Sequence, residues 1–127
     1  MINKDILISA IVMVVIDYFY LSSVSNYFNN LLLKIQNEKI KLDYSAAILC
    51  YIFLVFGLYY FVLKNNRPVK DAFFLGLIIY MVYEATNKAI FKNWDWKTVF
   101  MDGIWGGILF AITTFLTYKI KNYKLKK

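Results

Sequence analysis

Four long apolar runs set the strongest limit on what this chain can fold into. By residue number they cover 6–27, 44–63, 72–90 and 98–118. Each is close to the roughly 20 residues with which a helix crosses a ~30 Å hydrocarbon core. Backbone groups in lipid must be hydrogen-bonded within their own segment, so runs of this length predict membrane-spanning helices. The short polar links between them predict antiparallel neighbours, and therefore an up-down four-helix bundle.

The composition supports a membrane protein and excludes several kinds of chemistry. Of the 127 residues, 61% are apolar and 18% are charged, whereas a soluble domain has about 45–50% and about 25%. We expect one all-α integral membrane domain over 1–127, ending in a basic tail at 119–127. The sequence contains no His and one Cys, Cys50. This excludes His-based catalysis and His or thiolate metal sites, and we expect no cofactor.

The basic residues predict how the chain is oriented. Lys and Arg total 15 against 8 acidic residues, giving a net charge of +7, and they lie mostly between or after the apolar runs. We interpret the Lys-rich tail as an anchor on anionic lipid headgroups rather than as a nucleic-acid site. Four spans put both termini on one side, which carries nine basic residues against six. The positive-inside bias then places both termini in the cytoplasm.

Aromatic residues cluster near the ends of the runs. Such residues commonly sit at the boundary between hydrocarbon and headgroups. We therefore expect an outer aromatic belt made of Tyr27, Phe28, Tyr44, Trp94 and Trp96.

Four ionisable residues fall inside the apolar runs: Asp17, Glu84, Lys88 and Asp102. Such residues are costly in a bilayer and commonly mark a functional site. Counted from the outer helix ends at ~1.5 Å per residue, Asp102 lies ~6 Å deep, Glu84 ~10 Å and Asp17 ~10–15 Å. All three acids therefore fall in the outer half of the membrane, which indicates one shared polar site.

Helical spacing places other polar and aromatic residues beside these acids. Residues three or four apart share a helix face, and Lys88 follows Glu84 by four, so the two can pair. The predicted ligand-binding site consists of Asp17, Tyr51, Tyr80, Tyr83, Glu84, Asn87, Lys88, Asp102 and Trp105.

The chemistry of this site leaves several roles open. The cluster can bind or translocate a proton, a cation or a cationic lipid headgroup, with the aromatic side chains forming a wall for a quaternary ammonium group. Among metals only a hard ion such as Ca²⁺ or Mg²⁺ suits oxygen ligands, and we assign no metal site. The polar groups can instead cross-link the helices by hydrogen bonds alone.

A ridge of small residues runs along the last span. Gly103, Gly107 and Ala111 follow one another at four-residue spacing, a pattern that lets helices approach closely. We expect these residues to pack within the bundle, with a homo-oligomer contact as the alternative.

The chain resembles a bacterial membrane family known as domain of unknown function 2177. The first element of the resemblance is Asp17 followed by an aromatic residue and Leu, here Tyr20 and Leu21. The second is Gly76, Tyr80 and the segment 83–89 followed by a Trp, with Glu84 where the family has Asp. The third is an Asp-x-x-Trp-Gly pattern, matched here by Asp102, Trp105 and Gly106.

The resemblance implies a four-helix integral membrane protein without an established activity. Members often lie near lipid-modification genes, which favours a lipid-linked role. Three functions stay open: a binding or translocation protein, a lipid-modifying enzyme or its accessory subunit, and a structural protein whose polar cluster only specifies packing. We favour the first, and with it a non-enzymatic role. The expected partners are membrane lipids, a small ion or headgroup, and a second copy of the chain, but no nucleic acid.

Overall fold

A computed structural model describes residues 4–36 and 43–125. The described residues form four long α-helices and one short 3₁₀ helix, without a strand: α1 (Lys4–Gln36), α2 (Tyr44–Phe61), η1 (Leu63–Asn65), α3 (Val69–Ile90) and α4 (Trp96–Leu125). All four α-helices are long and apolar enough to cross a membrane. The predicted all-α, four-span membrane fold is therefore confirmed.

Two helices extend well beyond the apolar runs. The link expected at 28–43 is helical as far as Gln36, because Leu31 and its neighbours pack against Trp94 and Val99. At the other end, α4 continues through Leu125, and Lys121 Nζ pairs with Asp5 Oδ2 at 3.2 Å. Lys39 and Lys41 of the predicted link, and residues 126–127 of the predicted tail, lie outside the described residues.

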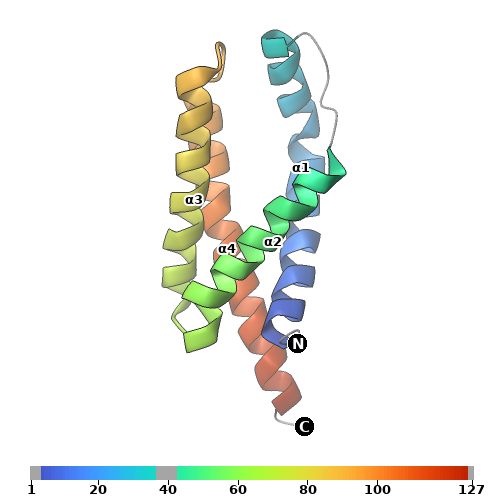
Figure 1. Ribbon diagram of the computed structural model, residues 1–127, viewed down its shortest axis with the longest axis vertical. Helices are drawn as coiled ribbons and strands as arrows, with labels where there is room; N and C mark the ends of the chain where they lie inside the picture. Colours follow the sequence, from blue (N-terminus) through green and yellow to red (C-terminus); the bar gives the residue numbers. More distant parts are fainter. Residues whose placement is uncertain (1–3, 37–42, 126–127) are drawn as a thin grey trace.

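The helices are not four equal, parallel rods (Figure 1). Helices α3 and α4 form a tight antiparallel pair, α1 packs along α4, and α2 crosses obliquely over the middle and lower part of the molecule. Both ends of the described chain lie at the same end of the molecule, as predicted (Figure 1). We call the opposite end the outer end; its assignment to the outside of the cell stays a prediction.

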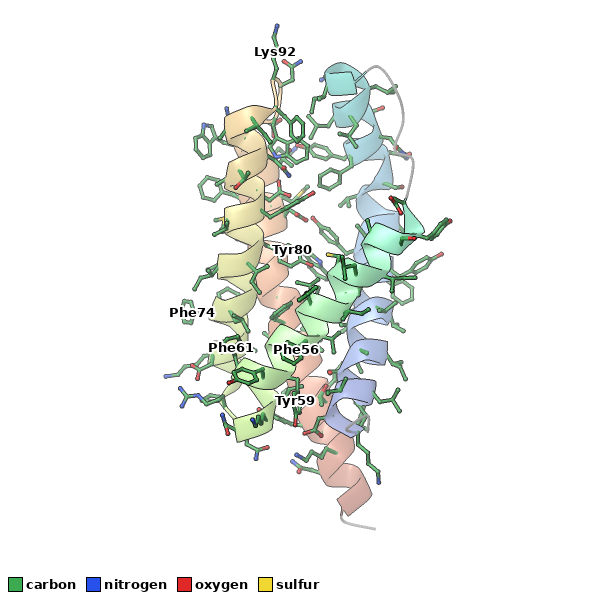
Figure 2. All side chains as sticks on the ribbon, in the orientation of Figure 1. Phe56, Tyr59, Phe61, Phe74, Tyr80 and Lys92 are labelled. Atoms are coloured by element: carbon green, nitrogen blue, oxygen red, sulfur yellow. The ribbon has the colours of Figure 1, made fainter. Side chains whose placement is uncertain are left out.

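The core lies where α2 crosses the other helices, in the half of the molecule nearer the termini. Its fully buried members include Met13 of α1, Leu58 of α2, and Leu109 and Phe110 of α4. Large apolar side chains such as Phe56, Phe61 and Phe74 point outward instead (Figure 2). This distribution suits a protein surrounded by hydrocarbon, in which apolar side chains need not be hidden.

Glycines bring α3 and α4 together. A Cβ atom added at Gly76 would lie 2.2 Å from the carbonyl oxygen of Gly106, and one added at Gly106 would lie 2.2 Å from the Tyr80 ring. The predicted ridge faces the same helix, because Gly103 lies against Met81 and Gly107 against Phe73, while Ala111 is half-buried. The α3–α4 pair is therefore held at a separation that side chains at these positions would prevent.

Candidate functional site

A cleft of about 540 Å³ lies between α1 and α3, nearer the outer end, and Asp102 of α4 also lines it. Three carboxylates, several aromatic rings and one amide line it: Asp17, Tyr20, Leu21, Phe28, Leu32, Tyr80, Tyr83, Glu84, Asn87, Phe91, Trp94 and Asp102. Leu21 on α1 and Tyr83 on α3 are 48% and 60% exposed. Both sides of the cleft therefore carry side chains that are accessible from outside the protein.

Asp17 joins three helices. Its Oδ2 accepts a hydrogen bond from the Tyr51 hydroxyl of α2, and its Oδ1 accepts one from Trp105 Nε1 of α4 at 3.0 Å. The Asp17 side chain is 6% exposed. Both oxygens therefore already have donors, and the geometry of this carboxylate is that of a cross-link between helices.

Tyr20 connects the Asp17 network to the second acid. Its ring stacks on the Trp105 indole with centroids 4.3 Å apart and planes 5° from parallel. Its hydroxyl donates to Asp102 Oδ1 at 3.1 Å. One turn of α1 thus carries an acid and a phenol that both contact the same face of α4.

Glu84 of α3 and Asp102 of α4 are two further acids in the lining of the cleft. Glu84 Oε1 accepts a hydrogen bond from Trp94 Nε1 at 2.9 Å, and the whole residue is 1% exposed. The carboxyl groups of Glu84 and Asp102 also lie within hydrogen-bonding reach of each other. Two adjacent carboxyl groups cannot both be ionised in a low-dielectric site unless a cation balances them.

Asn87 lies one helical turn beyond Glu84 on α3 and also lines the cleft. It is 7% exposed, and among the described residues its side-chain amide has no hydrogen-bond partner. Buried amides are normally hydrogen-bonded. Its free donor and acceptor are therefore available to a molecule in the cleft.

Not every residue of the predicted site lines this cleft. Tyr51 and Trp105 lie behind it and act on it through Asp17. Lys88 does not pair with Glu84: its Nζ lies 5.4 Å from the centroid of the exposed Trp96 ring. A lysine near a helix end lowers its energy by extending toward the headgroups, whereas Glu84 is turned into the protein.

The sequence-based site also omitted residues that the structure brings in. Trp94, expected in an aromatic belt, is 6% exposed and is hydrogen-bonded to Glu84. Tyr20 and Phe28 line the cleft beside it. Helical spacing could not find Trp94, because it follows the end of α3 and turns back toward the helix. The family resemblance already contained both Tyr20 and Trp94.

Among the described residues, no group of three acidic or Cys side chains is arranged to hold a metal ion. Within 4–36 and 43–125, no Lys or Arg lines the cleft. The ion pairs formed between described side chains, Arg67 with Asp71 and Lys121 with Asp5, are at the opposite end of the molecule.

Above the cleft, Asp95 caps the start of α4. Its Oδ1 accepts hydrogen bonds from the Thr98 backbone N at 2.9 Å, from the Thr98 hydroxyl at 2.6 Å and from the Tyr27 hydroxyl at 3.3 Å. The hydrogen bond from the Thr98 hydroxyl is the main reason why the pKa of Asp95 lies below its usual value. Asp95 thus fixes the beginning of α4 against α1.

Replacing Asp95 with alanine is expected to cost about 1 kcal/mol of unfolding free energy, the usual effect of losing an N-cap. Because the pKa of Asp95 is lowered by folding, its charged form stabilises the protein above the unfolded-state pKa. This contribution disappears as the pH falls through the lower pKa of the folded protein. Thermal unfolding in detergent across this acidic range checks both effects.

The matched control is Asp95→Asn, which keeps the cap without the charge. It should remain close to the wild type near neutral pH and lose this part of the pH dependence. An Asp95→Ala protein as stable as the wild type would contradict the capping role.

Comparison with known proteins identifies the family. The family model described as "Predicted membrane protein (DUF2177)" matches residues 2–119. No curated protein and no solved structure matches significantly. The predicted family and the integral, multi-pass membrane location are thus confirmed. With nearly its whole length matched, the chain belongs to the DUF2177 family of predicted membrane proteins.

Proposed function

We propose that the cleft between α1 and α3 binds an organic cation within the outer half of the membrane. The observation that carries the proposal is an imbalance of charge: Asp17, Glu84 and Asp102 line the cleft, and none of the described residues that line it is basic. An unbalanced carboxylate at this depth is costly. A positively charged guest removes that cost and contacts the acids directly.

The form of the cleft favours an ammonium group over a bare metal ion. Tyr20, Phe28, Tyr80 and Trp94 supply aromatic rings around the acids. Aromatic rings attract quaternary ammonium groups, by about 2 kcal/mol or more when water is excluded. The free amide of Asn87 offers one further polar contact.

The three acids take different parts in this proposal. Asp17 is already bonded on both oxygens, so it mainly supports the wall of the cleft. Glu84 and Asp102 each accept one hydrogen bond and face each other. The cation therefore binds against Glu84 and Asp102.

The variants Glu84→Gln and Asp102→Asn test this directly, with choline as the probe. Each substitution removes a charge but keeps an oxygen for the Trp94 or Tyr20 hydrogen bond. A ligand that binds only the folded protein raises its unfolding temperature. Choline is expected to stabilise the wild type, and each variant should bind it at least about tenfold more weakly, a difference of about 1.4 kcal/mol.

Asp43→Asn is the control. Asp43 is exposed and outside the cleft, and asparagine caps α2 as well as aspartate does. This variant should respond to choline as the wild type does. The proposal fails if choline stabilises all four proteins equally or none of them; in the latter case the acids are held protonated and only join the helices.

A further inference from the structure

A second hollow lies beside the cleft. It lies between α2 and α3, measures about 280 Å³, and is lined by Cys50, Leu54, Ile79, Tyr80, Tyr83 and Asp102. Three of these residues, Tyr80, Tyr83 and Asp102, also line the cleft. The two spaces are therefore adjacent, and apart from Asp102 the lining of the second one is almost entirely apolar.

We infer that the bound cation is the headgroup of a membrane amphiphile, and that its hydrocarbon chain lies in this hollow between α2 and α3. The inference rests on the proposed function, and it names the class of ligand. A free hydrated ion would make no favourable contact with an apolar hollow beside its binding site. A charged group joined to a hydrocarbon chain matches both the acidic cleft and the apolar hollow.

The direction of the hollow matches the way a lipid lies in the outer half of a bilayer. Along α3, Ile79 precedes Glu84 by five residues, which places it about 7.5 Å closer to the bilayer centre. Along α2, which runs the opposite way, Leu54 also lies deeper than Cys50. The headgroup thus points toward the outer end and the chain toward the membrane centre.

The hollow is also reachable from the lipid. Cys50 and Tyr83, on its two sides, are exposed, and Tyr80 projects from α3 toward the centre of the molecule (Figure 2). An amphiphile can enter sideways between α2 and α3 without its headgroup crossing the membrane.

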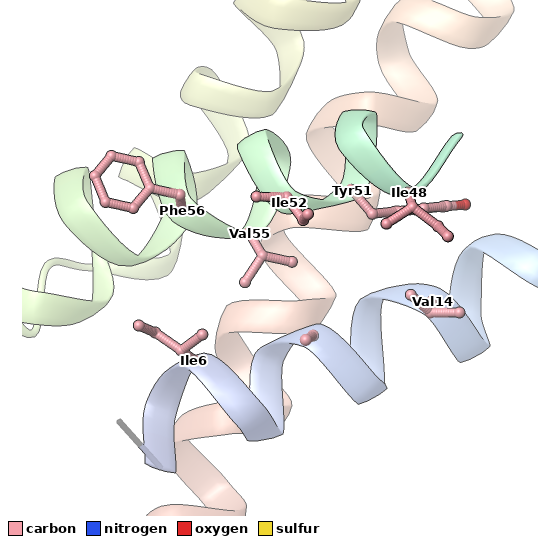
Figure 3. A pocket seen from close by; sticks show the side chains of 8 residues that line it. Ile6, Val14, Ile48, Tyr51, Ile52, Val55 and Phe56 are labelled. Atoms are coloured by element: carbon pink, nitrogen blue, oxygen red, sulfur yellow. The ribbon is translucent and has the colours of Figure 1, made fainter. Parts of the chain in front are cut away.

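A different apolar groove, between α1 and α2, provides the control (Figure 3). It measures about 530 Å³, and Ile6, Val14, Ile48 and Val55 are among the residues that line it. None of the described residues that line it is acidic, and the hydroxyl group of Tyr51 is hydrogen-bonded to Asp17. Nothing in this groove selects a cation.

The test compares two probes, choline and dodecyltrimethylammonium, on protein in maltoside micelles. Cys50→Trp fills the hollow between α2 and α3, and Ile48→Trp fills the groove between α1 and α2. Cys50→Trp should weaken binding of the long-chain probe at least about tenfold and leave choline binding unchanged. Ile48→Trp should change neither.

The other outcomes overturn the inference in distinguishable ways. If Cys50→Trp leaves both probes unchanged, or weakens both equally, the chain does not lie in the hollow, although the cation site stands. If Ile48→Trp is the variant that weakens the long-chain probe, the chain lies between α1 and α2. If neither probe binds the wild type, the proposed function fails together with the inference.

Discussion

Alanine at Gly76 is expected to prevent α3 and α4 from packing and to cost about 3 kcal/mol or more of unfolding free energy, the upper range for overpacking. The added Cβ would meet the Gly106 carbonyl oxygen at 2.2 Å and Phe110 Cγ at 2.7 Å. A backbone oxygen cannot rotate away as a side chain can. The helices must therefore separate. The expected loss of unfolding free energy is large compared with the total of about 5–15 kcal/mol in a typical protein.

Two other glycines make this prediction specific. Nothing lies within 4 Å of a Cβ added at Gly57, so Gly57→Ala should be neutral or slightly stabilising. Gly103→Ala should fall between the two, because the three atoms nearest to the added Cβ all belong to the flexible Met81 side chain. The unfolding temperatures of the three variants, measured in the same detergent, rank their stabilities. If Gly76→Ala unfolds at the same temperature as Gly57→Ala, the close α3–α4 packing is wrong.

Replacing Asp17 with alanine is expected to cause the second largest loss, about 1–3 kcal/mol, the usual cost of leaving a buried polar partner unsatisfied. The Tyr51 hydroxyl and Trp105 Nε1 would both lose their acceptor. The three helices joined at this point would then lack their shared polar contact. The effect is one of stability, distinct from the loss of binding expected at Glu84.

A double-mutant cycle of Asp17→Ala with Tyr51→Phe measures this contact. The coupling energy should fall near the ~0.6–1.7 kcal/mol found for hydrogen bonds between membrane helices. Asp17→Asn, which keeps one oxygen, should lose less than Asp17→Ala. Additive effects in the cycle would show that Asp17 and Tyr51 do not interact.

The sequence predicted the spans well and their ends poorly. Runs of apolar residues report which segments suit hydrocarbon, but a helix does not stop where its apolar run stops. Leu31, Leu32 and Ile35 follow two asparagines, yet packing against Trp94 and Val99 keeps them helical. The oblique path of α2 was not predicted either, because short links fix the direction of neighbouring helices but not their crossing angle.

The candidate site was also only partly predictable from the sequence. Depth and helical face placed Asp17, Glu84 and Asp102 together, and all three line one cleft. The depth of Asp17 was counted from an expected helix end near residue 27, whereas α1 runs to Gln36. The contacts through Tyr20 and Trp105 nevertheless bring it close to Asp102.

The residues that were missed or misplaced depend on side-chain direction. A four-residue spacing allows Lys88 to reach Glu84, but the long lysine side chain lies over Trp96 instead. The spacing allows Trp94 to point either toward the headgroups or back into the protein. In the structure it points into the protein, where its indole N–H donates a hydrogen bond to Glu84. Spacing along a helix does not distinguish such alternatives, since they are decided by partners on other elements.

The most direct test of the cation site compares choline with its uncharged isostere, in which a carbon atom replaces the quaternary nitrogen. The two have the same shape, so they differ in the one property that Glu84 and Asp102 recognise. Binding to the wild-type protein is measured by titration calorimetry in maltoside micelles. The account predicts that choline binds at least about tenfold more tightly than the isostere. Equal binding, or none by either compound, would contradict it.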